Sequence, residues 1–166
     1  PDSDGDGYSN PDASWGTGDG ADAFPAVATQ WADQDFDGYG DNAAGFQPDS
    51  CVVTLGNSSN DRFGCLDDDG DGYSNNDGSW LVSDGADGCN SVKAYSNIDR
   101  NGCPDEDGDG ASDPDPTGIN GSVWTVVDGA DAFLGDATQW SDSDGDGYGD
   151  NPLPATEGDA CVSVIG

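Results

Sequence analysis

A short pattern of alternating aspartates constrains the fold of this chain more than any other feature of its sequence. The pattern Asp-x-Asp-x-Asp-Gly-x begins at Asp2 and returns at Asp33, Asp67, Asp105 and Asp142. Carboxylates at positions one, three and five and a backbone carbonyl at seven suit a hard cation that takes six to eight oxygen ligands. Glycine at position six permits the sharp turn that wraps the backbone around such an ion.

Electrostatic repulsion opposes closure of these loops without a cation. Two carboxylates about 4 Å apart repel by roughly 4 kcal/mol at an effective dielectric constant near 20, so three carry on the order of 10 kcal/mol. A solvated acidic linker is the alternative, but five copies in one strict phase favour metal loops. Because calcium accepts many carboxylates and carbonyls whereas magnesium tends to keep its waters, the sequence predicts several Ca²⁺ ions, at least one for each of the five loops.

The predicted metal ligands fall into three sets. The first set comprises the loops themselves: Asp2, Asp4, Asp6, Tyr8, Asp33, Asp35, Asp37, Tyr39, Asp67, Asp69, Asp71, Tyr73, Asp105, Asp107, Asp109, Ala111, Asp142, Asp144, Asp146 and Tyr148. The second set follows the loops: Asn10, Asp12, Asp41, Asn75, Asp77, Asp113, Asp115 and Asp150. The third set comes from a later Asp-Gly-Ala-Asp motif: Asp19, Asp22, Asp84, Asp87, Asp128 and Asp131. Each loop needs a later carboxylate to complete its shell, although a plain Asp-Gly turn also explains this motif.

Three unequal repeats organise the chain. Each runs from a metal loop through a tryptophan to the Asp-Gly-Ala-Asp motif, and the first and third then share Ala-Thr-Gln-Trp before another loop. The predicted units are a long repeat at 1–65, a short repeat at 66–103 and a long repeat at 104–166, which stops before its closing cysteine.

Composition predicts an irregular fold that depends on bound metal. Hydrophobic residues make up only 33% of the chain, and the net charge of −32 opposes folding through self-repulsion. Bound calcium cancels part of that charge, so folding and metal binding are expected to be one process. We therefore predict an irregular, calcium-stabilised repeat fold with short β-strands and little or no helix. The β-branched runs that predict these strands are 52–55, 79–82, 122–127 and 161–165.

The cysteines predict two local disulfides. Cys51 and Cys65 have the same spacing as Cys89 and Cys103, and each second cysteine ends an Asp-Arg-x-Gly-Cys sequence. Each disulfide would contribute on the order of 3 kcal/mol by closing a short loop. Free thiols or transition-metal ligands are the alternatives, which the absence of histidine disfavours. Disulfides together with calcium loops indicate an extracellular or cell-surface location, and Cys161 is left without its expected partner.

These motifs resemble the thrombospondin type 3 repeat. The resemblance rests on Asp-x-Asp-Gly-Asp-Gly from Asp2, on Asp-Gly-Ala-Asp-Ala-Phe-Pro at 19–25 and on the acidic stretch 33–41, and the disulfide loops are similar to repeats in prokaryotic surface proteins. It implies a shell with little regular structure around a string of calcium ions, with Asp22 as a ligand beside the first loop. Phe24 and Phe133 stand where that family has a cysteine.

Charge and composition disfavour several functions. So acidic a surface repels nucleic acid and anionic lipid, and no apolar run approaches the ~18 residues needed to cross a bilayer. The chain has no histidine or methionine and only three basic residues, which removes most routes to general acid–base or nucleophilic catalysis, so we expect no enzyme.

The leading prediction is a calcium-stabilised extracellular structural protein, a subunit or segment of a surface filament, stalk or matrix. Its partners would be copies of itself, because the two ends fall in complementary phases of the repeat; a fragment of a longer tandem array is the alternative. The second prediction is an adhesion module that presents aromatic rings to glycans or proteins. An anchoring module of the dockerin kind is less favoured, because its two loops lie on helices.

Overall fold

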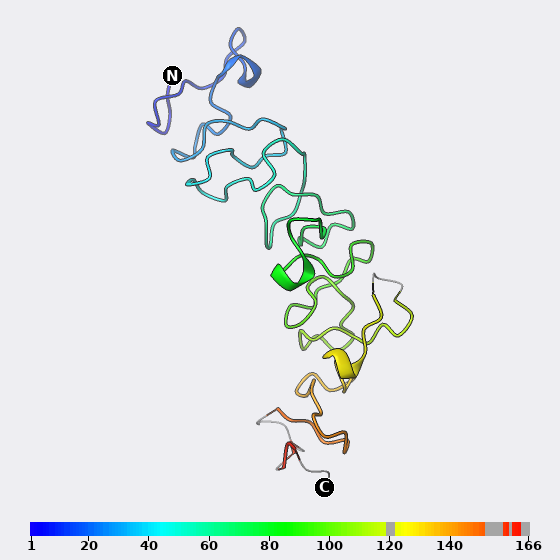
Figure 1. Cartoon of the computed structure of the whole chain (residues 1–166). Helices are drawn as coiled ribbons and strands as arrows, with labels where there is room; N and C mark the ends of the chain where they lie inside the picture. The colour runs from blue at the N-terminus through cyan, green and yellow to red at the C-terminus, as the bar shows by residue number, and fades with distance from the viewer. Residues whose placement is uncertain (119–121, 152–157, 160, 164–166) are drawn as a thin grey trace. The chain divides into compact units, whose positions relative to one another are not determined.

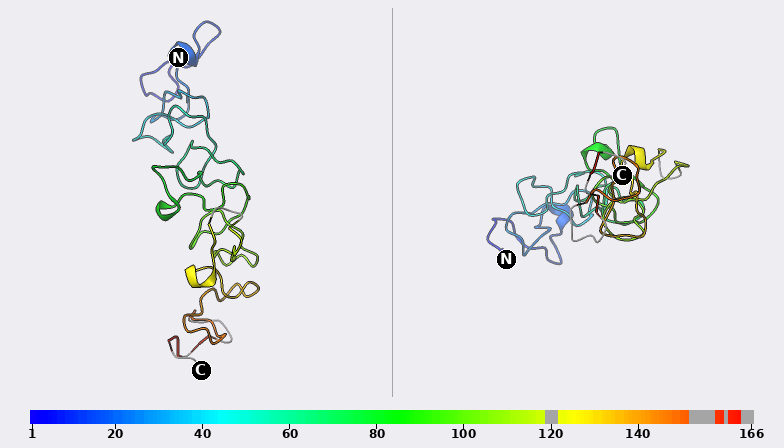
Figure 2. Two further views of the ribbon diagram at one scale, coloured as in Figure 1. Left: turned by 45° about the vertical axis from the view of Figure 1, so that its right-hand side comes forward. Right: turned by 90° about the horizontal axis from the view of Figure 1, so that it is seen from below.

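The computed structural model describes residues 1–118, 122–151, 158–159 and 161–163, and the chain divides into two compact units, Pro1–Asn75 and Asn76–Gly166. Within each unit the backbone follows irregular loops and turns, as the predicted fold class requires (Figures 1 and 2). These units reflect spatial contacts, and the three-repeat division of the sequence stays a prediction. None of the described helical segments is long and apolar enough to cross a membrane.

The regular helical structure in the described residues consists of three single turns of 3₁₀ helix. These are η1 (Thr17–Asp19), η2 (Val82–Asp84) and η3 (Val126–Asp128), coloured blue, green and yellow in Figure 1. Each turn ends at the first aspartate of Asp-Gly-Ala-Asp. The following glycine has a φ between 99° and 113°, a left-handed conformation that favours glycine. The Asp-Gly step of this motif therefore ends a helical turn.

The short strands predicted from β-branched runs are not formed. Residues 79–82 and 122–127 lead into η2 and η3, and residues 52–55 form a turn. Residues 161–163 also form a turn, and 164–165 lie outside the described residues. Sheet-like pairing in the described part of the chain is limited to isolated bridges. These join Asp12 to Trp15, Gly40 to Pro48, Asp115 to Trp124 and Gly149 to Gly158.

The strand prediction is wrong because these β-branched side chains lack an apolar surface to cover. Val53 is 70% exposed and Val127 is 97% exposed. Strand propensity mainly reflects packing of a side chain on a half-buried sheet surface. Where no such surface exists, the backbone takes the turns that its neighbouring glycines, asparagines and aspartates favour.

The interior is small and mostly polar. Within the described ranges, the buried hydrophobic residues are small ones: Ala21, Cys65, Ala86, Cys89, Cys103, Ala111 and Ala130. The largest fully buried side chains include Gln30 and the carboxyl groups of Asp22 and Asp87. Burial of apolar surface is therefore a minor source of stability, and the buried polar groups need partners to balance their desolvation.

A buried glutamine ties together the loop that follows the first Ala-Thr-Gln-Trp sequence. The Gln30 side-chain amide donates to the carbonyls of Asn42 and Phe46, both at 3.1 Å, and its Oε1 accepts the Asn42 amide at 2.9 Å. Gln139 makes matching bonds with Asn151. A Cβ on Gly40 would lie 2.2 Å from Gln30 Oε1, so glycine is required there.

Replacing the buried Gln30 with alanine should destabilise the first unit by about 2–3 kcal/mol, because the part-buried Asn42 amide loses its acceptor. Urea unfolding in saturating calcium measures this change. Gln34→Ala is the matched control, since the Gln34 side chain is exposed, and its unfolding midpoint should stay within experimental error of the parent protein. Equal midpoints for both variants would contradict a structural role for Gln30.

Candidate metal centres

Five aspartate triads bring their carboxylates together at the predicted loops. In each triad, one oxygen from each carboxylate lies within 4.8 Å of the others. The triads are Asp2, Asp4 and Asp6; Asp33, Asp35 and Asp37; Asp67, Asp69 and Asp71; Asp105, Asp107 and Asp109; and Asp142, Asp144 and Asp146. Each loop therefore holds three acidic oxygens close enough together to share one cation.

Backbone amides fix the carboxylates in each triad. In the first loop, the Asp2 carboxylate accepts the Gly5 amide at 2.7 Å and the Gly7 amide at 3.1 Å, and Asp6 Oδ1 accepts the Tyr8 amide at 2.7 Å. Equivalent bonds recur in the four other loops. The loop is therefore shaped by its own hydrogen bonds before any ion is considered.

Two positions in each loop require a left-handed backbone. The glycine at position six has φ between 91° and 103° in all five loops, which explains why every copy of the aspartate pattern has glycine at that position. Position four is also left-handed, with glycine at φ 77° to 83° in four loops and Phe36 at φ 65° in the second. Phe36 lies in the small left-handed region, a conformation that is allowed but rare for a bulky side chain.

A fourth carboxylate approaches the first triad from outside the loop. Asp22 is 0% exposed, its backbone amide donates to Ser9 O at 2.9 Å, and its Oδ1 accepts the Phe24 amide at 2.8 Å. Its Oδ2 is buried without a hydrogen-bond partner, as are Asp4 Oδ2 and Asp6 Oδ2. Buried carboxylate oxygens without donors are costly, so this cluster fits a cation.

The same arrangement closes other loops. The Oδ1 atoms of these later aspartates each accept the amide two residues further on, at 2.6–2.8 Å, in Asp22, Asp49, Asp87, Asp131 and Asp159. As Asp22 does with Ser9, Asp49 donates its backbone amide to Gly40 O, Asp131 to Ser112 O and Asp159 to Gly149 O. These carbonyls all belong to position eight of a loop, so one backbone bond sets where the extra carboxylate lies.

Sequence reasoning missed Asp49 and Asp159 because it looked for the closing acid only in Asp-Gly-Ala-Asp. Both have an Oδ2 that is buried without a hydrogen-bond partner. A shared sequence pattern could have found them. Asp49 lies two residues before Cys51 and Asp159 lies two residues before Cys161, just as Asp22 lies two residues before Phe24.

The environment of these added carboxylates favours their protonated form when no ion is bound. Burial raises the pKa of Asp49 to about 6, and repulsion from Asp37 and Asp35 adds to the effect. Burial also raises the pKa of Asp131 to about 6, with added repulsion from Asp109 and Asp107. A cation would remove this repulsion directly, since it offsets the charge that raises these pKa values.

The second predicted set forms hydrogen bonds around the loops. Its position-nine members accept the amide at loop position two: Asn10, Asp41, Asn75, Asp113 and Asp150. Asp12, Asp77 and Asp115 accept amides two and three residues later and so hold turns. Hydrogen bonds from the Ser14 amide and hydroxyl lower the pKa of Asp12, as expected for a satisfied carboxylate.

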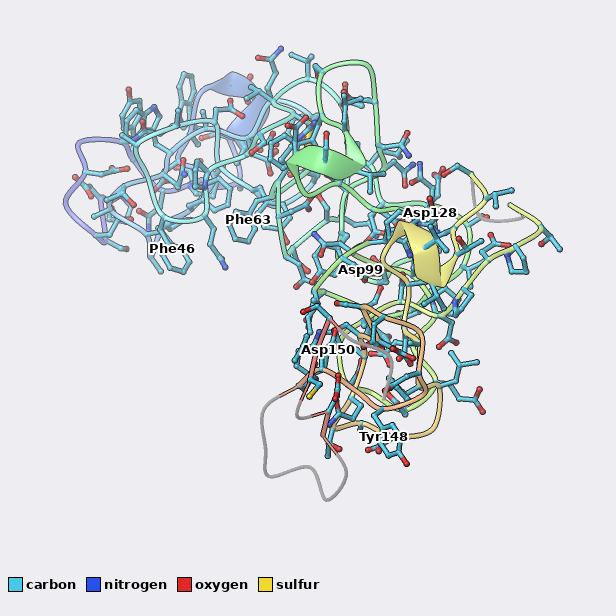
Figure 3. The ribbon with its side chains drawn as sticks, turned by 60° about the horizontal axis from the view of Figure 1, so that its bottom comes forward. Phe46, Phe63, Asp99, Asp128, Tyr148 and Asp150 are labelled. Atoms are coloured by element: carbon cyan, nitrogen blue, oxygen red, sulfur yellow. A yellow bond between two sulfur atoms is a disulfide. The ribbon has the colours of Figure 1, made fainter. Side chains whose placement is uncertain are left out.

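The third predicted set separates into two structural roles. Asp22 and Asp131 approach triads, whereas Asp19, Asp84 and Asp128 accept the amide that precedes their 3₁₀ turn, each at 3.1 Å. Figure 3 places Asp128 on η3. Direct contact of an ion with these turn-capping aspartates, with the second set, or with the carbonyls of Tyr8, Tyr39, Tyr73, Ala111 and Tyr148 stays a prediction.

Comparisons with known proteins do not assign this chain to a family. No protein-family model matches the chain, and no curated protein matches it. The resemblance to thrombospondin type 3 repeats therefore stays a prediction, and the sites are interpreted from their geometry and chemistry.

The raised pKa values predict opposite pH dependences with and without metal. In the metal-free protein, Asp49 and Asp131 bind protons more tightly when folded, so their contribution to stability is fully present below about pH 4 and is lost as pH rises through about 6. In saturating calcium only the ionised carboxylates bind, so stability rises over the same window. Near-UV circular dichroism of the tryptophans at pH 4–7 measures both trends, and a metal-free protein that gains structure towards pH 7 would contradict the first.

Asp49→Ala should remove a ligand that the sequence pattern did not reveal. We expect calcium at the loop 33–37 to bind at least roughly tenfold more weakly, because an ion there loses a charged ligand. Calorimetric titration and counting of bound ions by native mass spectrometry measure the loss. Asp136→Ala is the control, because Asp136 is exposed and only holds a turn with Thr138. Unchanged binding in Asp49→Ala would contradict the assignment.

Proposed function

We propose that this chain is a calcium-stabilised extracellular structural protein, a subunit or segment of a surface filament, stalk or matrix. The observation that supports it best is the convergence of a buried, partnerless carboxylate oxygen of Asp22 on the triad of Asp2, Asp4 and Asp6. An interior made from such clusters has little stability of its own without bound cations. In such a protein calcium would serve to stabilise the fold, and a structural role for the chain follows from this dependence of folding on calcium.

Calcium is the cation that the donor set suits best. Each site offers several carboxylates, and only oxygen donors are present in the triads. A hard cation with high and flexible coordination can accept these ligands, whereas magnesium demands near-octahedral geometry and tends to retain water. Soft transition metals prefer thiolate or imidazole ligands; the chain has no histidine, and four of its five cysteines form disulfides.

The disulfides support an extracellular setting. They join Cys51 to Cys65 and Cys89 to Cys103, as the spacing predicted. Disulfides persist in oxidising compartments, and calcium is abundant outside cells. In a chain with so small a hydrophobic interior, each closed loop adds stability that packing does not supply.

Calcium would also permit copies of the chain to associate. A net charge of −32 makes two copies repel strongly in the absence of cations. Ions shared between exposed carboxylates of two copies would replace that repulsion with attachment. Assembly and folding would then depend on the same ion, which suits a structural element in calcium-rich surroundings.

The experiment combines metal removal with measurement of assembly. With millimolar calcium, sedimentation velocity should detect oligomers and electron microscopy should show ordered polymers. Excess chelator should dissociate them and abolish the near-UV circular dichroism of the tryptophans. A chain that stays monomeric at every calcium concentration would contradict the structural role, and an unchanged spectrum in chelator would contradict calcium stabilisation.

A second candidate function is adhesion to a glycan or protein partner. The first unit has a cavity of about 430 Å³ lined by Tyr8, Trp31 and Phe36, and the Tyr8 and Trp31 rings stack with centroids 5.1 Å apart. Phe36 is 63% exposed although its backbone is left-handed, which favours a role for its ring at the surface. Saturable glycan binding by monodisperse particles, lost in Phe36→Gly, would favour adhesion over assembly.

A further inference from the structure

The two disulfide loops are built alike and therefore allow a direct comparison. In the loop 51–65, the buried Ser58 hydroxyl donates to Arg62 O and accepts the Cys65 amide at 3.0 Å. In the loop 89–103, the buried Ser96 makes the corresponding bonds. The loops share spacing, flanking residues and internal bonding, so differences between them reflect local environment.

Exposure of the sulfurs distinguishes the two disulfides. Cys65, Cys89 and Cys103 are each 1% exposed, whereas Cys51 is half-buried. A thiolate must reach one sulfur from the side opposite the other sulfur to exchange with a disulfide. Of the four bonded cysteines, Cys51 is therefore the one that keeps part of its surface open to solvent, and so the one that a thiolate can approach most readily.

The arginine of each loop lies against the disulfide of that loop. Arg62 Nη2 lies 3.0 Å from Cys51 Sγ and 2.9 Å from Cys65 Sγ, and Arg62 Nε lies 3.3 Å from Cys65 Sγ. Arg100 Nη2 donates to Gly88 O at 2.8 Å and lies 3.6 Å from Cys89 Sγ. The Arg100 guanidinium is also 5.4 Å from the Trp124 ring centroid, a cation–π contact. Two guanidinium nitrogens thus contact Cys65 Sγ closely in the first loop.

We propose that the disulfide between Cys51 and Cys65 is a thiol-exchange site, at which a thiolate attacks Cys51 Sγ and Cys65 Sγ departs. A new sulfur–sulfur bond forms to Cys51, the bond between Cys51 and Cys65 breaks, and its electron pair leaves on Cys65 Sγ. The attacking thiol releases its proton to water beforehand. One disulfide replaces another, so the step needs no external oxidant or reductant.

Arg62 favours this direction of attack. Negative charge develops on the departing sulfur as the bond breaks, and a guanidinium already in contact with Cys65 Sγ stabilises that charge without reorganisation. Attack on Cys65 would be disfavoured because that sulfur is buried. Accessibility and charge therefore select the same sulfur, Cys51, as the one that receives the thiol.

Exchange would release the segment that connects two of the candidate metal loops. Inside this segment, the Gly56 amide donates to Asp37 Oδ2 at 3.3 Å, and the Ser59 amide donates to Gly72 O at 2.8 Å. The thiolate could be a small extracellular thiol or Cys161 of a second copy, since Cys161 is free and exposed. The chemistry at Cys51 is the same for both sources.

Limiting glutathione, added to the full chain carrying Cys161→Ser in saturating calcium, tests the proposal. Proteolysis followed by mass spectrometry gives the rate and position of each mixed disulfide. We expect glutathione on Cys51, formed at least about tenfold faster than any adduct at Cys89 or Cys103, because those two cysteines are each only 1% exposed and a thiolate must reach the sulfur that it attacks. Equal rates at the two disulfides, or an adduct on Cys65, would overturn it.

Arginine variants separate charge stabilisation from simple loosening of the loop. Arg62→Gln should slow exchange at Cys51 about tenfold, whereas Arg62→Lys should retain part of the rate because it keeps the charge. Arg100→Gln is the matched control and should leave the rate at Cys51 unchanged. Faster exchange in Arg62→Gln would overturn the role of Arg62, because it would mean that the arginine only holds the loop closed.

A final arm identifies the source of the thiolate. The chain with its native Cys161 is incubated without glutathione. Covalent dimers joined through Cys161 and Cys51 would show that a second copy supplies the thiol. If the chain stays monomeric, a small thiol is the attacking group. These results do not depend on which metal the loops bind. Failure of exchange therefore leaves the proposed calcium role intact, and failure of calcium binding is detected separately by titration.

Discussion

Repulsion between carboxylates brought close together by the backbone is the constraint on which the rest of this structure depends. The triad of Asp2, Asp4 and Asp6 is held by backbone amides, and the buried Asp22 adds a further negative charge to it. Such a cluster is unfavourable in a low dielectric unless a cation is bound. The loops therefore provide the shape of a site, and the proposed calcium would provide the free energy that makes the shape stable.

This constraint fits the lack of large apolar side chains among the fully buried residues that the structure describes. The space that leucine or phenylalanine occupies in an ordinary core is taken here by Asp22, Asp87 and Gln30. Larger rings such as Phe36 and Tyr148 remain exposed. The disulfide loops add stability where hydrophobic packing is weak, because each is hydrogen-bonded to a neighbouring candidate metal loop, as the Ser59 amide is to Gly72 O.

Local chemistry could be predicted well and longer-range partners less well. The triads and both disulfides follow from residue types at fixed spacing, so the sequence revealed them. Asp49 and Asp159 were missed because the chain length between a loop and its extra carboxylate varies. The predicted strands failed because β-branched residues such as Val127 indicate a strand only where a surface exists for them to cover.

The sequence by itself determined which residues carry charge, where the backbone turns at left-handed glycines and which cysteines lie close enough to pair. These properties depend on neighbours a few residues away, and short-range geometry fixes them. Only the tertiary structure decided which later carboxylate approaches each triad. The backbone bond from the Asp49 amide to Gly40 O sets that position, and no sequence motif marks which two residues form it. The tertiary structure also decided that Cys51 is accessible while Cys89 is buried, since exposure depends on how whole loops pack.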